Sequence, residues 1–377
     1  MNHYTSDDTL EKNMIKYAAA KSVPINGSFE LLPLCNLNCK MCYVRLSREE
    51  MEKQGRLRTA DEWLTLAEQM QKAGTLFLLL TGGEPLIYPD FKKLYLGLKK
   101  LGFIISVNTN GTLLNEEWAD FFKENKPRRI NITLYGADEN AYKNLCNYPA
   151  GFEKTINALK LLKERNVPAK ISFSATRANA DMLGDIYRIG KELDMLVETD
   201  TYMIPAIKER DLPIAEQSRL EPEQAAAARV AVMRHDMGDG VLGEYIDAVL
   251  KESENANTYP DCISCLAGNC GFTINWKGEM KPCVTFDEPA VSVFEVGFDE
   301  AWRQISQRTK EFHLNPKCVN CNLRVVCPTC VASAFLETGS YDGVPEYLCR
   351  YAAETLRLYK EEHSKDNMIN QLSETEK

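Results

Sequence analysis

Apolar runs typical of β-strands alternate with amphipathic runs typical of α-helices through the N-terminal half of the chain. This alternation is characteristic of βα units, which build a parallel sheet covered by helices. We predict strands over residues 29–34, 76–80, 104–108, 130–134, 169–173 and 196–202. We predict helices over residues 60–72, 91–101, 116–123, 151–165, 182–193 and 221–237. Six units fall short of the eight that close a full barrel, so the expected fold is α/β with a partial (β/α)6 barrel of the TIM type.

Composition divides the rest of the chain into segments of different character. After an N-terminal extension (1–27) and the barrel (28–205), a charged and Ala-rich stretch over 206–258 predicts a helical bridge. Residues 259–349 hold nine of the 13 cysteines with little periodicity, which is typical of a small domain whose core is a metal site. Residues 350–377 predict a C-terminal helix that ends in a polar tail.

Charge and hydropathy exclude several classes of protein. The chain has 377 residues, with 45 basic and 54 acidic side chains and a net charge of −9, which argues against binding to nucleic acid. The longest apolar run, residues 76–80, is far too short to span a membrane, and the polar N-terminus does not form a signal peptide. We therefore expect a cytoplasmic protein, in which 13 cysteines indicate metal binding rather than disulfides.

The first group of cysteines, Cys35, Cys39 and Cys42, lies in one loop directly after the first predicted strand. Three thiolates leave one metal position open, as expected of a catalytic site. Half of a zinc site, completed elsewhere in the chain, is the alternative interpretation. Iron–sulfur clusters also take Cys thiolates and, unlike zinc, carry electrons. Cys146, alone in the middle of the chain, is expected to be a small buried hydrophobic residue.

The spacing C-x3-C-x2-C in CNLNCKMC resembles the signature of the radical S-adenosylmethionine (radical SAM) enzymes. The resemblance implies that Cys35, Cys39 and Cys42 hold a [4Fe–4S] cluster whose fourth iron chelates SAM. Reductive cleavage of SAM then gives a 5′-deoxyadenosyl radical that abstracts a hydrogen atom from the substrate. The family usually has an aromatic residue before the third cysteine, whereas this chain has Met41, which can pack on the adenine.

Further motifs follow the next predicted strands. Gly82, Gly83 and Glu84 match the family's GGE element, which by resemblance binds the SAM amino group. Glycines permit close backbone approach to a ligand, and a carboxylate pairs with an ammonium group. Thr133 ends the fourth strand, where the resemblance implies contact with SAM, although a plain β-branched strand residue is the alternative. Because strands of a barrel end at one mouth, we expect these groups to meet there.

The second group of cysteines resembles the SPASM extension of radical SAM enzymes, which carries two auxiliary [4Fe–4S] clusters. Its spacing is too tight for the usual zinc ribbon, although zinc in this region stays open. The resemblance implies an outer cluster held by Cys318, Cys321, Cys327 and Cys349. It implies an inner cluster held by Cys265, Cys270, Cys283 and Cys330, and Cys262 competes with Cys270 for its place. With the SAM cluster, the expected cofactors are three [4Fe–4S] clusters and SAM.

Resemblance favours an oxidative peptide maturase that forms a thioether or other crosslink in a precursor peptide. An anaerobic sulfatase maturase, which forms formylglycine, is the alternative enzyme, although Val284 follows Cys283 where those enzymes place a base. A non-catalytic iron–sulfur or zinc scaffold is the alternative of another class. The catalytic base is not assigned, and Asp287, Glu279 and Tyr202 are candidates that also suit structural roles.

The expected partners follow from that chemistry. The clusters need an electron donor such as a ferredoxin or flavodoxin. Because only 34 residues precede Cys35, we expect leader recognition to lie on a separate protein or on the bridge over 206–258.

Overall fold

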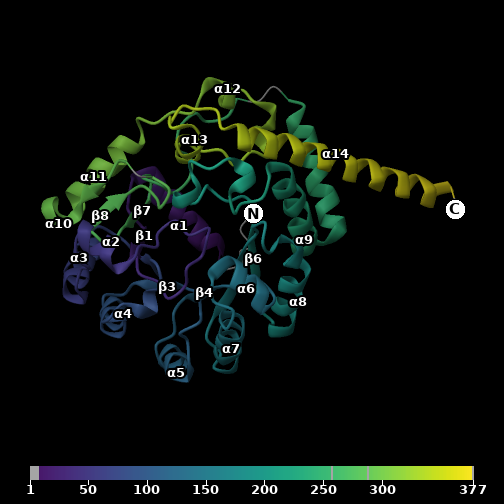
Figure 1. Cartoon of the computed structure of the whole chain (residues 1–377). Coiled ribbons are helices and arrows are strands. Elements are labelled where there is room, and N and C mark those ends of the chain that lie inside the picture. The colour runs from purple at the N-terminus through teal and green to yellow at the C-terminus, as the bar shows by residue number, and fades with distance from the viewer. Residues whose placement is uncertain (1–7, 256–257, 287, 376–377) are drawn as a thin grey trace.

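The computed structural model describes the backbone of residues 8–255, 258–286 and 288–375 (Figure 1). Its centre is a nine-stranded sheet with the order β6-β5-β4-β3-β2-β1-β7-β8-β9. The strands are β1 (Asn26–Glu30), β2 (Phe77–Thr81), β3 (Ile104–Thr109), β4 (Arg129–Thr133), β5 (Ala169–Ser174), β6 (Val197–Asp200), β7 (Gly271–Ile274), β8 (Glu279–Lys281) and β9 (Val291–Ser292).

Fourteen helices and five short 3-10 turns are present in the described residues. The barrel region holds α1 (Asp8–Lys21), α2 (Arg48–Gln54), α3 (Ala60–Lys72), α4 (Phe91–Lys100), α5 (Glu116–Glu124), α6 (Glu139–Cys146), α7 (Gly151–Glu164) and α8 (Leu183–Leu193). The rest holds α9 (Pro222–Ser253), α10 (Val293–Val296), α11 (Phe298–Thr309), α12 (Pro316–Val319), α13 (Val331–Thr338) and α14 (Glu346–Thr375). The 3-10 turns are η1 (Pro85–Ile87), η2 (Ala180–Met182), η3 (Ile207–Glu209), η4 (Ile214–Glu216) and η5 (Asn322–Val325).

The predicted partial barrel is confirmed. Strands β1 to β6 pair in parallel in sequence order, and the connecting helices lie outside the curved sheet (Figure 1). Apolar strand residues such as Val107 and Ile132 are fully buried in the core that the helices complete. Residues that alternate with them are polar, and Asn131 donates a hydrogen bond to Asn108 over 2.7 Å. One face of the sheet therefore packs on helices while the other lines a polar interior.

The first strand lies earlier than predicted and three barrel helices were not predicted. β1 ends at Glu30; Leu31 N–H still donates to Thr81 of β2, and the carbonyls of Leu32 and Leu34 accept from the loop after β2. Helices α1, α2 and α6 lie in segments where we predicted no element. α2 begins with a capping box in which Ser47 and Glu50 satisfy each other's backbone N–H groups, a signal that is visible in the sequence.

The cysteine-rich region extends the barrel sheet rather than forming a separate one. β7 pairs in parallel with β1, from Asn26 opposite Gly271 to Phe29 opposite Ile274, and β8 and β9 continue the sheet as antiparallel strands. The division between barrel and auxiliary region stays a prediction, since one sheet runs through both.

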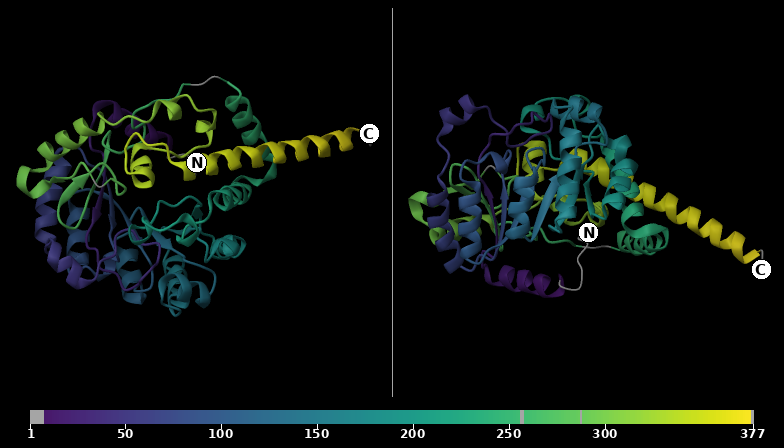
Figure 2. Two further views of the ribbon diagram at one scale, coloured as in Figure 1. Left: turned by 45° about the horizontal axis from the view of Figure 1, so that its top comes forward. Right: turned by 90° about the horizontal axis from the view of Figure 1, so that it is seen from below.

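Two long helices pack on each other beyond the sheet. α9 contains a break at Gly238, whose φ of 73° is non-helical, and its residues share an apolar cluster with α14. The last part of α14 projects from the body of the protein (Figure 2).

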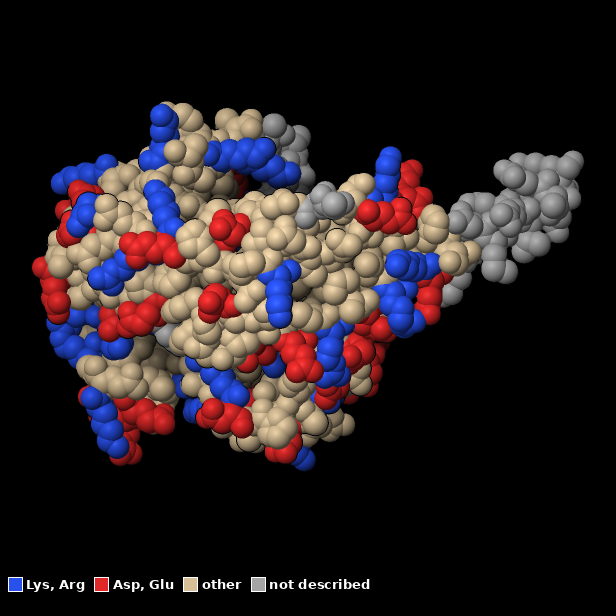
Figure 3. Space-filling model, turned by 90° about the horizontal axis from the view of Figure 1, so that it is seen from above, with Lys and Arg blue, Asp and Glu red and all other residues tan. Residues whose placement is uncertain are grey.

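Within the described residues, no helix is long and apolar enough to cross a bilayer. Seen from above, Lys and Arg side chains intermingle with Asp and Glu, so this face carries no patch of one sign (Figure 3).

A buried ion pair joins helix α13 to the segment that precedes helix α9. Arg219 donates to Glu337 over 2.9 Å, and the two side chains are only 3% and 8% exposed. The guanidinium also lies 4.0 Å from the ring centroid of Tyr347, whose hydroxyl donates to the carbonyl of Leu220 over 2.7 Å. Because a buried charge is costly without its partner, this contact holds the auxiliary region against the bridge.

We predict that Arg219→Met lowers the free energy of unfolding by roughly 3–5 kcal/mol, because it leaves the Glu337 carboxylate buried and unpaired. Urea unfolding of the metal-free protein measures the change. The double variant Arg219→Met/Glu337→Leu should recover most of the loss. Arg188→Met, whose guanidinium is 59% exposed and pairs with Asp185, should change stability by less than about 1 kcal/mol. Equal effects of the two single variants would contradict this account.

Candidate active site

A polar cleft opens where the barrel strands end, and the first group of cysteines lines it. The cleft encloses about 880 Å³, including space open to solvent. Cys35, Cys39, Cys42 and Met41 line it from the loop after β1. Gly82 and Gly83 line it after β2, and Thr133 lines it at the end of β4. The structure therefore brings together all the predicted SAM-site residues except Glu84, whose position is described below.

Backbone hydrogen bonds fix the cysteine loop on the end of α6. Asn38 N–H donates to the carbonyl of Cys146 over 3.1 Å, and Lys40 N–H donates to that of Leu145 over 2.9 Å. Cys146 is fully buried beside Cys39 in an apolar cluster with Leu145, which agrees with its predicted place in the interior. An unpredicted helix thus holds the loop that carries the thiols.

Burial opposes ionisation of two of the three thiols. It raises the pKa of Cys35 to about 12, and the charges of Glu84, Cys39 and Cys42 add to the rise. Burial likewise raises the pKa of Cys42, whereas hydrogen bonding to Cys146 lowers the pKa of Cys39. Three thiolates crowded in one half-buried loop require a positive centre, which iron ions supply. The donor set therefore fits an iron–sulfur cluster with one open iron.

The backbone of the cysteine loop is held by α6. In the described parts of the chain, no three His, Cys, Asp or Glu side chains stand in metal-ligating positions, so the cluster assignment rests on the donor set and its spacing.

The glycines of the second motif allow that loop to pack directly on the chain leaving β1. Gly83 N–H donates to the carbonyl of Leu32 over 2.7 Å, and Glu84 N–H donates to that of Leu34 over 2.9 Å. A Cβ atom would lie 2.5 Å from the Leu32 carbonyl oxygen at Gly82 and 2.2 Å from the Leu34 oxygen at Gly83. Gly82 also has a φ of +135°, which other residues rarely adopt. The close approach therefore excludes any side chain at these two positions.

Glu84 lies beneath the cleft rather than among the residues that line it. Its carboxylate is fully buried and accepts hydrogen bonds from Thr109 Oγ1 and Asn110 N–H over 2.8 Å and from Leu86 N–H over 3.0 Å. Burial raises the pKa of Glu84 to about 7 despite these donors. In this geometry Glu84 joins the loops after β2 and β3, and its contact with the SAM amino group stays a prediction.

The loop after β3 also reaches the cysteine loop. Asn110 Nδ2 donates to Asn36 Oδ1 over 3.0 Å and lies 3.7 Å from Cys35 Sγ.

Several cleft residues were missed by sequence reasoning, namely Arg45, Tyr135, Ser174 and Met203. The last three follow or end strands β4, β5 and β6, so the rule that strand ends form the site could have found them.

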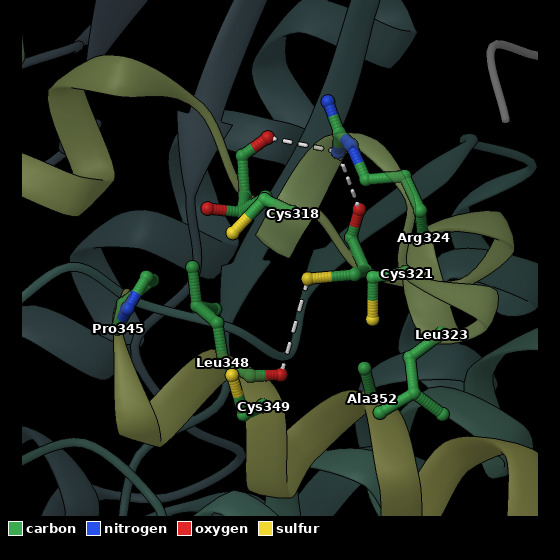
Figure 4. Close-up of a pocket in the computed structure, with 10 residues that line it drawn as sticks. Cys318, Cys321, Leu323, Arg324, Pro345, Leu348, Cys349 and Ala352 are labelled. Carbon is green, nitrogen blue, oxygen red and sulfur yellow. Dashed lines mark hydrogen bonds between the residues drawn. The ribbon is translucent and has the colours of Figure 1, made fainter. Parts of the chain in front are cut away.

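Four cysteines of the second group line one pocket of about 300 Å³ (Figure 4). They are Cys318, Cys321, Cys327 and Cys349, the set expected at the outer auxiliary cluster. Burial raises the pKa of Cys327 to about 11, and the charges of Cys349 and Cys318 add to it. Arg324 donates to the carbonyls of Cys327 and Thr329 over 3.1 and 3.0 Å and so fixes the loop between the thiols.

The remaining cysteines of the second group come from the segments before β7, after β8 and at the start of α13. Burial raises the pKa of Cys283, and the charges of Cys330 and Cys265 add to the rise. Cys270 is fully buried near Ile25 and Phe77, and burial together with the charge of Cys265 raises its pKa to about 11. Cys262 is exposed. Membership of Cys270 in an inner cluster stays a prediction, as does that of the other three.

The candidate bases lie in different surroundings. Glu279 pairs with Lys277 over 3.0 Å and accepts from Asn275 over 2.7 Å. Tyr202 has a buried hydroxyl with no hydrogen-bond partner in the described structure, and its ring lies 5.8 Å from that of Tyr347. Asp287 lies outside the described residues.

The chain is similar to known proteins in sequence and in fold. Residues 29–176 match the family model described as the radical SAM superfamily. An "AdoMet-dependent heme synthase" of Methanosarcina barkeri is 25% identical over 344 residues, covering 86% of this chain and 95% of the relative. The "Sporulation killing factor maturation protein SkfB" of Bacillus subtilis is 24% identical over 79% of this chain and 68% of the relative. The crystal structure of Streptococcus suis SuiB bound to precursor peptide SuiA has a similar fold, with a TM-score of 0.67, 17% identity and coverage of 92% and 82%.

We predict that Gly83→Ala lowers the free energy of unfolding by roughly 1–3 kcal/mol, because the added methyl group must displace the Leu34 carbonyl. Chemical denaturation of the metal-free protein measures the loss. Gly240→Ala is the matched control, since no atom lies within 4 Å of a Cβ at that position. Wild-type stability of Gly83→Ala would show that the loops do not need this close contact.

Protonation of Glu84 makes the free energy of unfolding depend on pH, and the direction of this dependence follows from its pKa. Its pKa in the folded protein, about 7, lies above the ordinary value of 4.5, so folding favours the protonated acid. The stability it contributes is complete below pH 4.5 and is lost as the pH rises through 7. We predict that wild type loses more unfolding free energy than Glu84→Gln between these pH values, as measured by urea denaturation at intermediate pH. Parallel pH profiles would contradict the assignment.

Proposed function

Because residues 29–176 form a radical SAM domain, we propose that this enzyme uses SAM to oxidise a peptide and to form a thioether or other crosslink in it. The domain implies one [4Fe–4S] cluster and SAM as cofactors. The observation that carries the proposal is the convergence of Cys35, Cys39 and Cys42 with the loop of Gly82 and Gly83 on one cleft. When bound there, the cluster and SAM supply the adenosyl radical that removes a hydrogen atom.

The residues of the chain bind and orient these groups. Cys35, Cys39 and Cys42 would hold the cluster, and the α6 end would keep their loop in place. The backbone of Gly82 and Gly83 offers a surface without side chains to SAM. Thr133 offers a hydroxyl to SAM and Met41 an apolar, polarisable contact for its adenine. Buried groups around the cleft exclude water from the reacting atoms.

Two auxiliary clusters complete the proposal. Cys318, Cys321, Cys327 and Cys349 would hold the outer one. Cys265, Cys270, Cys283 and Cys330 would hold the inner one. Formation of a crosslink after hydrogen abstraction releases one electron and one proton, and an auxiliary cluster is the acceptor that the chain offers for the electron. A ferredoxin or flavodoxin would reduce the SAM cluster.

A peptide substrate is supported by the relatives. SkfB is a maturation protein, and SuiB, which shares the fold, binds a precursor peptide. Recognition of a leader segment would belong to a separate protein or to the bridge over 206–258. A second candidate is oxidation of a heme precursor, favoured by the relative described as a heme synthase, which this chain matches over 95% of the relative's length.

The test is anaerobic reconstitution of the full chain. We expect about 12 irons per chain, from three clusters of four, and production of 5′-deoxyadenosine from SAM and dithionite. Single Cys→Ala variants at positions 35, 39 and 42 should abolish SAM cleavage, while Cys262→Ala serves as the matched control and retains it. Zinc in place of iron, or SAM cleavage by the Cys35→Ala variant, would refute the proposal.

The product distinguishes the candidate substrates. Incubation with the peptide encoded beside this gene should give a product lighter by two hydrogen atoms, with a crosslink located by tandem mass spectrometry. Formylglycine in a sulfatase peptide, or heme formed from a precursor, would assign one of the alternatives instead.

A further inference from the structure

Arg45 lies in the cleft with its charge unpaired. Its backbone N–H donates to Cys42 Sγ over 3.3 Å, so the main chain serves the cysteine loop while the side chain lines the cleft. The Nε atom is buried and has no hydrogen-bond partner. Across the described residues, the guanidinium forms neither an ion pair nor a hydrogen bond. Arg45 as a whole is half-buried, and a buried donor of this kind is normally satisfied, so its guanidinium is available to a ligand in the cleft.

Other arginines close to Arg45 in the sequence form ion pairs with glutamates. Arg48, three residues further along the chain, pairs with Glu52, and Arg56 pairs with Glu62 over 2.7 Å. Arg58 also pairs with Glu62, over 3.2 Å. The chain as a whole has an excess of nine negative charges, yet within the described residues no carboxylate forms an ion pair with Arg45.

The cleft contains no other permanent charge. Apart from the cysteines, the described residues that line it are Arg45, uncharged polar residues such as Asn108, Thr133 and Ser174, and apolar residues. Glu84, the nearest candidate to balance the arginine, is instead buried under three hydrogen bonds from the loops after β2 and β3. A ligand with an anionic group would thus meet one cation and no competing anion.

We propose that Arg45 binds a carboxylate group inside the cleft. This inference rests on the proposed function, since it assumes that the cleft holds SAM and a substrate. A guanidinium presents paired N–H donors that match a carboxylate, and such charge-assisted pairs are the strongest hydrogen bonds in proteins. Two sources offer this chemistry, namely SAM itself and an acidic side chain or C-terminus of the peptide.

The position of Arg45 favours the substrate as the source. Arg45 stands two residues before Ser47, the N-cap of α2, so it lines the cleft from the side where α2 begins. The glycine loop and Thr133 line the cleft from β2 and β4. A substrate that enters past α2 would place an acidic group on Arg45.

The thiolates of the cysteine loop are the rival partner for Arg45. Its charge lowers the pKa of Cys39 and Cys42, although for both thiols it is the smallest of the named causes. Thiolates that ligate iron share their charge with the metal, and a sulfur atom does not match the paired donors of a guanidinium as a carboxylate does. If substitution of Arg45 abolishes the preference for ligands with a carboxylate, then a carboxylate and not the thiolates is its partner.

The experiment uses the reconstituted full chain, its variants Arg45→Gln and Arg45→Lys, and four probes. SAM and decarboxylated SAM are measured by equilibrium dialysis. The tripeptides N-acetyl-Gly-Glu-Gly-amide and N-acetyl-Gly-Gln-Gly-amide are measured by ligand-observed NMR, with and without SAM. Arg48→Gln is the matched control, and iron content and circular dichroism establish that each variant is folded and loaded.

We expect wild type and Arg48→Gln to bind the Glu tripeptide roughly tenfold more tightly than the Gln tripeptide, and Arg45→Gln to lose this preference. Arg45→Lys should keep part of it, because a lysine retains the charge without the paired donors. SAM binding should be unchanged by either variant. A tenfold loss for SAM but not for decarboxylated SAM in Arg45→Gln would also establish carboxylate binding, with SAM as the source.

Equal binding of each probe pair by wild type and Arg45→Gln would overturn the inference and assign Arg45 to the thiolates. The tripeptide measurements without SAM report on Arg45 even if SAM fails to bind. Absence of SAM binding and cleavage in wild type would be a failure of the proposed function, which the tripeptide result identifies separately.

Discussion

The site depends on the close packing of two backbone segments at the ends of β1 and β2. The loop of Gly82 and Gly83 donates to the carbonyls of Leu32 and, through Glu84, Leu34, and leaves no room for a Cβ atom. Residues 31–34 lead directly into Cys35, so this contact fixes where the cysteine loop begins. The contact continues the pairing of β1 with β2 beyond Glu30, since Leu31 N–H donates to Thr81 just before it. One steric requirement, the absence of side chains at Gly82 and Gly83, therefore determines the path of the chain into the first thiol.

The cysteine-rich region is organised by a different constraint. Its helices are short, and its main apolar cluster around Phe286 and Leu314 includes Cys318 and borders Cys283. Burial raises the pKa of these thiols, so the protein gathers neutral thiols whose protons the proposed clusters would have to displace. The Arg219–Glu337 pair and the continuation of the sheet into β7 hold the region before any metal binds. The fold of this region and its cofactors are thus coupled, although the backbone frame comes from the barrel.

Much of this arrangement could be predicted from sequence because strand and helix periodicity and cysteine spacing are local signals. The six barrel strands and the alternation of Val107 with Asn108 follow from them. Other features depend on contacts between distant residues and carry no local signal. Cys146 looked like an isolated cysteine, and only the packing of α6 shows that it lies against Cys39. Glu84 was predicted to face SAM from a motif, whereas its burial depends on Thr109 and Asn110 from the next strand.

The two charged residues nearest the cleft illustrate how the fold sets the electrostatics of the site. Glu84 is buried under three donors, and burial still favours its neutral form, so it contributes little negative charge near neutral pH. The guanidinium of Arg45 lines the cleft, and its Nε atom has no hydrogen-bond partner in the described structure. The Arg45 N–H donates to Cys42 Sγ over 3.3 Å, so this cation stands beside the cysteine loop from which it comes. If the thiols hold the proposed cluster, an anionic group of a ligand on Arg45 would be kept close to that cluster. One short loop, residues 35–45, therefore supplies both the thiols and the cation of the cleft.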